Sequence, residues 1–211
     1  MKRALIILLS IIMLTLSLVA CGKNGDVPNG MKVANDKSNG FYTMYVPENW
    51  EVIETASNVT LAQAQVSELK TNKLTAVTVN AMFWQMDQNY ETKDEAYNGF
   101  FTSYDEQMKE TFGEENYHPL GEVANSPYYE GAKEYTYVAK YGDIYYKYVV
   151  TVIAYNKIYY AITFNFPQSN LKVDAAGTIT PTENYEKADF DYIKSYNSAI
   201  DDIVSNFKPL K

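Results

Sequence analysis

Three β-like stretches follow one another between residues 134 and 166 with only short turns between them, which restricts the possible folds of this chain strongly. They cover about 134–140, 144–155 and 158–166, and Gly142-Asp143 and Asn156-Lys157 mark the turns. Strands joined by turns this short pair in antiparallel fashion, because a parallel pair needs a long crossover connection. The sequence therefore predicts an antiparallel meander.

The alternation of side chains predicts the register of the last two stretches. Even-numbered residues from Ile158 to Phe166 share one face, and the more apolar face of the preceding stretch is also even-numbered, from Ile144 to Ala154. Opposed residues of an antiparallel pair lie on the same side of the sheet, so even must oppose even. This requires an odd loop, and we expect a three-residue turn with a bulge at Tyr155-Asn156-Lys157.

Helical periodicity appears twice, and together with the strands it predicts the α+β class. Thr92 and Glu95 match a T-x-x-E capping box, and apolar residues then recur at helical spacing up to Phe112, as in a buried stripe. A second amphipathic helix is expected over about 190–207, with Asp189 as its cap and Pro209 as its stop. Further strands are expected at 41–46, 50–54 and 75–84, whereas 59–69 could be helix or strand. The polar insertion at 167–188 is either functional or disordered.

The N-terminal segment indicates where the protein is located. Lys2 and Arg3 precede an apolar stretch that ends in Leu18-Val19-Ala20-Cys21, which has the layout of a secretion signal. This four-residue segment resembles the lipobox of bacterial lipoproteins, whose cysteine receives a diacylglycerol and becomes the new N-terminus. The alternative, a transmembrane helix, requires a longer apolar span. We expect residues 1–20 to be a signal peptide and Cys21 to be lipidated, which places the protein at the extracytoplasmic side of the cell membrane.

Removal of the signal defines the expected domain organisation. Residues 21–40 are rich in Gly, Asn, Lys and Asp, so we expect a lipid-anchored flexible tether that spans roughly 25 Å on average. The folded domain is expected at 41–211. Cys21 is the only cysteine of the 211 residues, so no disulfide can form within the chain and the core must stabilise the domain.

The charge balance excludes one class of partner. The chain has a net charge of −8, and loss of Lys2 and Arg3 makes the remainder two charges more negative and free of arginine. Nucleic-acid binding requires a dense basic surface, so we expect no nucleic-acid partner. An anionic membrane surface would also repel the domain, which leaves the lipid at Cys21 as the expected membrane contact.

The sequence offers few candidates for chemistry. His118 is the only histidine, so no histidine-based metal cluster is possible, and no serine lies in a G-x-S-x-G motif. The carboxylate pairs Glu114-Glu115, Asp189/Asp191 and Asp201-Asp202 are explained by a helix end, a helix start and a solvated helix side. Motifs for calcium or nucleotide binding are missing from the sequence. We therefore expect no catalytic residues, no metal and no cofactor.

The order of elements resembles the PsbP-like family. An early strand runs into Pro47-x-x-Trp50, central strands, a long helix and an antiparallel meander follow, and the closing helix ends in Val204-Ser205-Asn206-Phe207-Lys208. The resemblance covers about residues 41–211 and rests on element order more than on these short motifs. It implies an α/β/α sandwich around an antiparallel sheet. It also implies a non-enzymatic role, since relatives are accessory subunits of membrane complexes, envelope lipoproteins or binders of a small GTPase.

Two functional hypotheses follow. The first is a lipid-anchored accessory module that binds a protein partner in the cell envelope without chemistry of its own. The alternative is a ligand-binding lipoprotein that captures a glycan or peptide through Tyr145, Tyr155 and Tyr159, which the expected register places on one face. That face is either an open aromatic platform or is covered by a helix, and we favour the covered arrangement.

Overall fold

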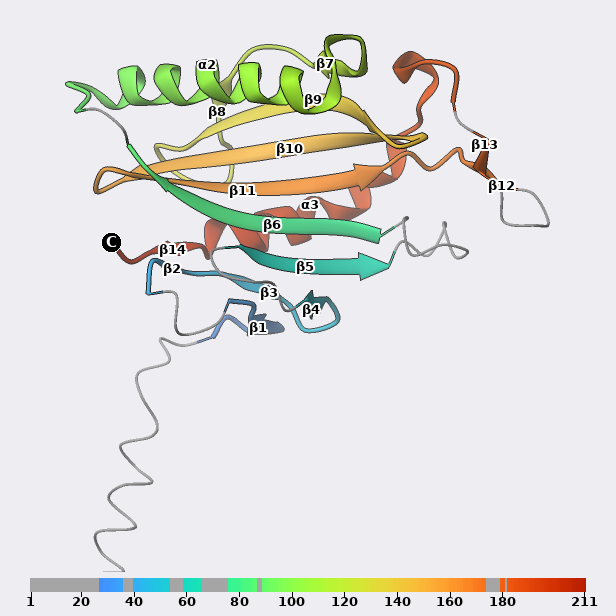
Figure 1. Cartoon of the computed structure of the whole chain (residues 1–211). Helices are drawn as coiled ribbons and strands as arrows, with labels where there is room; N and C mark the ends of the chain where they lie inside the picture. Colours follow the sequence, from blue (N-terminus) through green and yellow to red (C-terminus); the bar gives the residue numbers. More distant parts are fainter. Residues whose placement is uncertain are drawn as a thin grey trace, which may run out of the picture.

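An antiparallel eight-stranded sheet forms the centre of the fold (Figure 1). The structure is a computed structural model, and it describes residues 27–35, 40–53, 59–65, 76–86, 89–173, 179–180 and 182–211. The strands of the sheet, in spatial order, are β4 (Glu51–Ile53), β5 (Thr60–Gln65), β6 (Ala76–Gln85), β11 (Ile158–Pro167), β10 (Ile144–Tyr155), β9 (Lys133–Tyr141) and β7 (Tyr117–Pro119), with β8 (Ala124–Asn125) also paired to β9. The meander predicted from the sequence is therefore present as β9, β10 and β11.

The turn between β10 and β11 differs from the prediction. Tyr155 pairs directly with Ile158, so the loop has two residues, Asn156 and Lys157, with φ values of 46° and 62°. Two successive positive φ angles are typical of a type I′ hairpin turn, whose twist matches that of the strands. The predicted three-residue turn is wrong because β10 is buried on both faces, so it has no single apolar face from which the register could be read.

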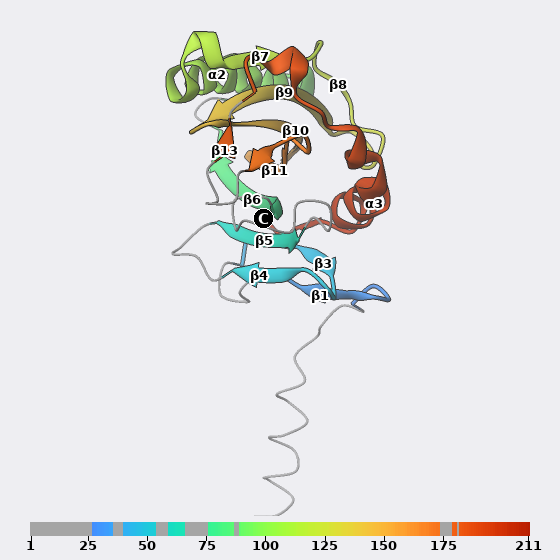
Figure 2. The same ribbon diagram turned by 90° about the vertical axis from the view of Figure 1, so that its right-hand side faces the viewer.

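Helix α2 (Lys93–Phe112) covers one face of the sheet over β9 and β10 (Figure 2). The predicted capping box is present: the Thr92 side chain accepts from the Glu95 amide at 3.2 Å, and the Glu95 carboxylate accepts from the Thr92 amide at 3.3 Å. The helix ends at Gly113, whose φ of 84° suits glycine. The apolar stripe of α2 packs on this face of the sheet, as the sequence predicts.

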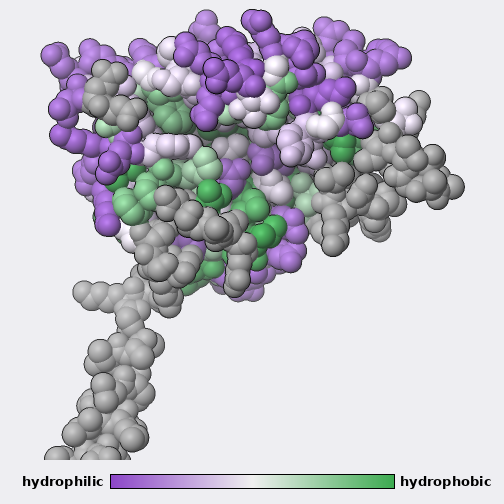
Figure 3. All heavy atoms as spheres, in the orientation of Figure 1, coloured by the Kyte–Doolittle hydropathy of each residue, from purple (hydrophilic) through white to green (hydrophobic). Residues whose placement is uncertain are grey.

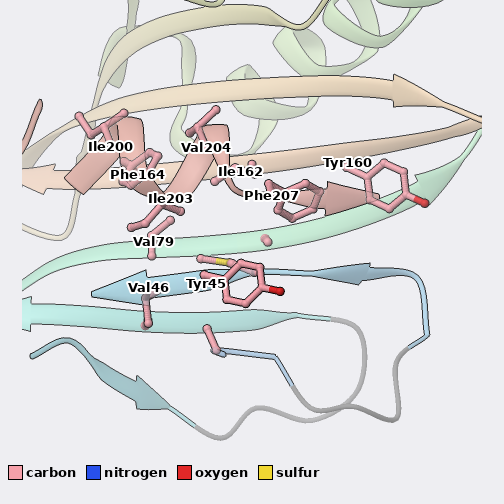
Figure 4. Packing of buried hydrophobic residues seen from close by; sticks show 14 of the residues in the cluster. Tyr45, Val46, Val79, Tyr160, Ile162, Phe164, Ile200, Ile203, Val204 and Phe207 are labelled. Carbon is pink, nitrogen blue, oxygen red and sulfur yellow. The ribbon is translucent and has the colours of Figure 1, made fainter. Parts of the chain in front are cut away.

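Helix α3 (Asn197–Ser205) packs on the opposite face of the sheet (Figure 2). Its residues Ile200, Ile203 and Val204 are buried beside Phe164 of β11 and Val46 (Figure 4). A 3-10 helix, η5 (Asp191–Tyr196), precedes α3, so the predicted C-terminal helix is divided into two parts. With helices on both faces of an antiparallel sheet, the α+β class and the α/β/α layering are confirmed.

Short strands beside α3 complete this layer. Strand β1 (Met31–Val33) pairs with β3 (Tyr45–Pro47), and β2 (Tyr42–Thr43) pairs with β14 (Lys208–Pro209). The second pairing joins the N-terminal and C-terminal parts of the domain. The segment left open at 59–69 contains the strand β5. Within the predicted insertion, β12 (Lys172–Val173) pairs with β13 (Ile179–Thr180), and the 3-10 helix η4 (Tyr185–Lys187) follows.

The predicted tether at 21–40 is too long. Met31 is buried, and the amide of Ala34 donates to the Met44 carbonyl at 2.9 Å. The Asn35 side chain donates to the Tyr42 carbonyl at 2.7 Å and accepts from the Met44 amide at 2.8 Å. Residues 31–35 therefore belong to the domain, because strand pairing and one buried amide side chain hold a segment whose composition looks polar. Residues 1–26, including the predicted signal peptide and Cys21, lie outside the described residues.

Candidate functional site

The three tyrosines predicted to form an aromatic face lie in different environments. Because the turn has two residues, Tyr159 shares its side of the sheet with Ala154, whereas Tyr145 and Tyr155 lie on the other side. Tyr159 is 6% exposed under α2 and donates its hydroxyl to the Ala96 carbonyl at 2.7 Å, and Tyr145 is only 5% exposed. A common platform of these three side chains is therefore not formed.

Tyr155 is the exposed member of the three. It is 46% exposed and lines a cavity of about 240 Å³ at the hairpin turn, together with Tyr90 and Lys157. The Lys157 ammonium donates to the Asn89 side chain at 2.8 Å across this cavity. The cavity therefore has one exposed aromatic ring, beside an ammonium group that already has a hydrogen-bond partner.

A different set of tyrosines gathers beneath α2. We call it the tyrosine layer, and it consists of Tyr104, Tyr117, Tyr135, Tyr137 and Tyr148. The rings of Tyr137 and Tyr148 stack with centroids 4.6 Å apart, and the hydroxyls of Tyr104 and Tyr137 lie 3.0 Å apart. Rings from α2, β7, β9 and β10 thus form one layer of packed rings between helix and sheet, in which Tyr104 bonds to Tyr137 and Tyr117 bonds to Tyr135.

Asp105 of α2 is the charged group of this layer. Its Oδ1 accepts hydrogen bonds from the hydroxyls of Tyr117 at 2.9 Å and Tyr135 at 3.3 Å, and its Oδ2 lies 2.6 Å from the Lys109 ammonium. Burial opposes ionisation of Asp105, but the hydrogen bond from Lys109 and those from the tyrosines outweigh it, so the pKa of Asp105 lies below its ordinary value. Asp105 is therefore ionised at neutral pH.

The tyrosines themselves remain neutral at neutral pH. Burial raises the pKa of Tyr104 to about 12, against a smaller lowering by its hydrogen bond with Tyr137. Burial also raises the pKa of Tyr117, and its hydrogen bonds with Tyr135 and Asp105 raise it further. The layer therefore offers hydroxyl donors and one fixed carboxylate, and it has no base poised to accept a proton near neutral pH.

A cavity of about 370 Å³ opens beside Asp105 at the outer side of the tyrosine layer. Its lining includes Phe101 and Tyr135, which supply ring surface, and two carboxylates, those of Asp105 and Glu122. Val123 also lines the cavity, and both Val123 and Leu120, in the loop between β7 and β8, are exposed, at 38% and 43%. An aromatic wall next to carboxylates is the chemistry that receives an organic cation.

No pattern in the sequence predicts this cavity. Tyr117 and Tyr135 reach Asp105 only because β7 pairs with β9 beneath α2. The alternating tyrosines at 135 and 137 are the one local signal of a tyrosine-rich strand face. Nothing near Asp105 or Glu122 in the sequence points to their common lining of a cavity.

The remaining candidates occupy positions with structural explanations. His118 of β7 stacks on the Tyr185 ring with centroids 3.9 Å apart, and burial lowers its pKa. Asp189 accepts from the Asp191 amide at 2.9 Å at the start of η5, as expected of a carboxylate at a helix start. In the part of the chain that the structure describes, no three His, Cys, Asp or Glu side chains are grouped to hold a metal ion. No helix among these residues is long and apolar enough to cross a membrane.

Comparison with known proteins gives a likeness of fold. No sequence model of a known family matches the chain, and no curated protein sequence matches it either. Among solved structures, the Ran-binding protein Mog1p of Saccharomyces cerevisiae has a TM-score of 0.52 at 12% identity, covering 86% of this chain and 97% of Mog1p. The two chains share a fold.

Two further structures are similar at a lower level. PsbP of the cyanobacterium Synechocystis sp. PCC 6803 has a TM-score of 0.43 at 13% identity, covering 90% of this chain and 96% of that one. A protein of Bacteroides thetaiotaomicron has a TM-score of 0.45 at 10% identity, over 82% of this chain, and the match spans only 46% of that protein's length. Neither of these two likenesses reaches the level of the Mog1p match, and membership of the PsbP-like family stays a prediction.

Proposed function

We propose that this chain is a lipid-anchored protein of the extracytoplasmic side of a cell membrane. In this proposal it is a non-enzymatic binding or accessory component of the cell envelope. The observation that carries the anchoring is the Leu18-Val19-Ala20-Cys21 box after a charged and apolar N-terminal segment. Two acyl chains at a processed cysteine form a lasting anchor, which a single chain does not provide.

The position of β1 supports a defined orientation of the anchored domain. Strand β1 starts at Met31, about ten residues after Cys21, and a stretch of that length reaches at most about 35 Å even when fully extended. Strand β1 and helix α2 lie at opposite ends of the domain (Figures 1 and 2). In an anchored molecule the β1 end would stay near the bilayer, and α2 would face away from it, accessible to other molecules.

A binding role without catalysis agrees with the chemistry of the described side chains. The buried tyrosines have raised pKa values, Asp105 is held as a carboxylate by three donors, and His118 is stacked on Tyr185. These groups hold the domain together, and none is arranged as a nucleophile with an adjacent base. Mog1p, which shares the fold, is a Ran-binding protein, and this supports a role of the fold as a binding module. The alternative, capture of a glycan or peptide, is less well supported, because Tyr145, Tyr155 and Tyr159 do not form a common platform.

Replacement of the cysteine tests the anchoring. Cells expressing the full chain are fed a clickable palmitate analogue, and the protein is then purified and assayed for label and for membrane association. We expect the wild type and the neighbouring control Asn24→Ala to be labelled and membrane-bound. Cys21→Ala should lack the label and keep its uncleaved signal segment. Equal labelling of Cys21→Ala and wild type would refute the lipid anchor.

A further inference from the structure

The outer side of α2 carries an excess of negative charge. The helix has five carboxylates and two lysines, and one of these lysines, Lys109, is paired with Asp105. Glu114, Glu115 and Glu122 follow close to its C-terminal end and are exposed. Figure 3 shows hydrophilic side chains gathered along α2 and more apolar ones on the sheet below. A partner surface with positive charge is therefore attracted to this side, and a negatively charged one is repelled.

The cavity beside Asp105 lies on this negatively charged side of the molecule. Phe101 and Tyr135 form an aromatic corner, with ring centroids 5.8 Å apart, and both residues line the cavity. Asn98, on the exposed side of α2, and Glu122, on the facing loop, complete opposite walls. Its volume of about 370 Å³ is in the range of small binding sites and exceeds that of a single guanidinium or ammonium group.

The chain itself shows that a cation fits at this edge. The Lys109 ammonium lies 2.6 Å from Asp105 Oδ2, while the side chain of Lys109 remains 44% exposed. Asp105 is held in place by the Tyr117 and Tyr135 hydroxyls, so its carboxylate cannot turn away when Lys109 moves. Glu122 is exposed and offers a second carboxylate to an incoming group.

We propose that the cavity between α2 and the β7–β8 loop receives an arginine or lysine side chain from a basic segment of a protein partner. Apolar residues of the same segment contact Leu120 and Val123. The cation pairs with Glu122, in competition with Lys109 for Asp105, and contacts the small exposed part of Phe101 and Tyr135, each of which is 8% exposed. This inference rests on the proposed binding function and adds the chemistry of the partner.

A peptide titration tests the proposal without knowledge of the partner. The chain from residue 21, carrying Cys21→Ala so that no lipid is needed, is labelled with nitrogen-15 and titrated with acetyl-Gly-Arg-Gly-amide. The matched probe is the citrulline peptide, which has nearly the same shape and no charge. We expect saturable shifts of the amides of Asn98, Asp105 and Glu122 with the arginine peptide, and at most weak shifts with citrulline.

Two variants locate the binding. Glu122→Gln should weaken the arginine peptide roughly fivefold at low salt, as expected for loss of a partly exposed ion pair. Asp202→Asn, on the exposed side of α3, should leave the affinity unchanged. Equal shifts with citrulline, shifts spread evenly over α3, or unchanged affinity of Glu122→Gln would each overturn the proposal. Because these readouts do not involve the lipid or an envelope partner, they can fail while the proposed function stands.

Discussion

Replacing Tyr97 by phenylalanine removes one hydroxyl that joins helix α2 to the sheet. Strand β9 begins at Lys133, which pairs with Val152, so the amide of Ala154 lies beyond the end of that ladder. The Tyr97 hydroxyl accepts from this amide at 3.0 Å and donates to the Gly131 carbonyl at 2.7 Å. A side chain of the helix thus continues the hydrogen bonding of the sheet where the neighbouring strand has ended.

The loss of unfolding free energy in Tyr97→Phe follows from the backbone groups that lose their hydrogen-bond partner. Phenylalanine fills nearly the same space, so no cavity term arises, but the Ala154 amide is left buried without its acceptor. An unpaired buried amide costs about 1–3 kcal/mol. The Gly131 carbonyl is in an exposed residue and can bond to water instead. We therefore expect a loss of about 2 kcal/mol, which corresponds to a melting temperature lower by about 4–8 °C in a domain of this size.

Urea and thermal unfolding of the chain from residue 21 with Cys21→Ala measure this loss, and amide hydrogen exchange locates it. The matched control is Tyr141→Phe, because Tyr141 is 67% exposed and its change should stay within about 0.5 kcal/mol. Exchange at the Ala154 amide should become faster in Tyr97→Phe and stay unchanged in the control. If both variants unfold alike and exchange at Ala154 is unaltered, the hydroxyl does not hold α2 as described.

Three further changes follow from the structure. Gly99→Ala, which raises the stability of an exposed helix by about 1 kcal/mol, should raise the urea midpoint by less than that gain, because a β-carbon there meets the end of the Tyr90 side chain, which must move. The full gain should appear in a Tyr90→Ala background, and equal gains in both backgrounds would contradict this contact. Lys157→Gly should raise stability by about 0.5–1 kcal/mol in the same assay, since Lys157 has a φ of 62°, and equal or lower stability would contradict the turn type. The pKa of Asp105 is lowered in the folded state, so its stabilising effect is present above the ordinary value of 3.8 and is lost as the pH falls through the folded pKa. Melting curves between pH 2 and 6 should therefore be less pH-dependent in Asp105→Asn than in the wild type, and parallel curves would exclude this role.

Local signals allowed much of the fold to be predicted. The capping box at Thr92 and Glu95 and the apolar stripe that follows are properties of contiguous residues, and α2 begins where they place it. The meander was predicted because its turns are short. The class and the layering follow from these elements, since apolar helix faces must be buried against a sheet.

The wrong predictions concern features that are set by residues far apart in the sequence. The register of β10 and β11 was predicted from a single apolar face, but both faces of these strands are buried. Helices α2 and α3, from different parts of the chain, cover these two faces. Strand β1 lies in a segment of polar composition, and its pairing with β3, the burial of Met31 and the hydrogen bonds of Asn35 order it. The cavity at Asp105 likewise requires β7 and β9 to meet under α2, which no local pattern encodes.

The most direct test of a non-enzymatic binding role is an affinity pull-down from detergent-solubilised envelope of the source organism. The bait begins at residue 21 with Cys21→Ala, so that it includes β1, which is part of the domain. Bound protein and bound glycan are both quantified for this bait alone and with Glu122→Gln or Asp202→Asn added. We predict one membrane protein in stoichiometric amount with the unaltered bait and with Asp202→Asn, and less of it with Glu122→Gln. Recovery of glycan without any stoichiometric protein would contradict the account.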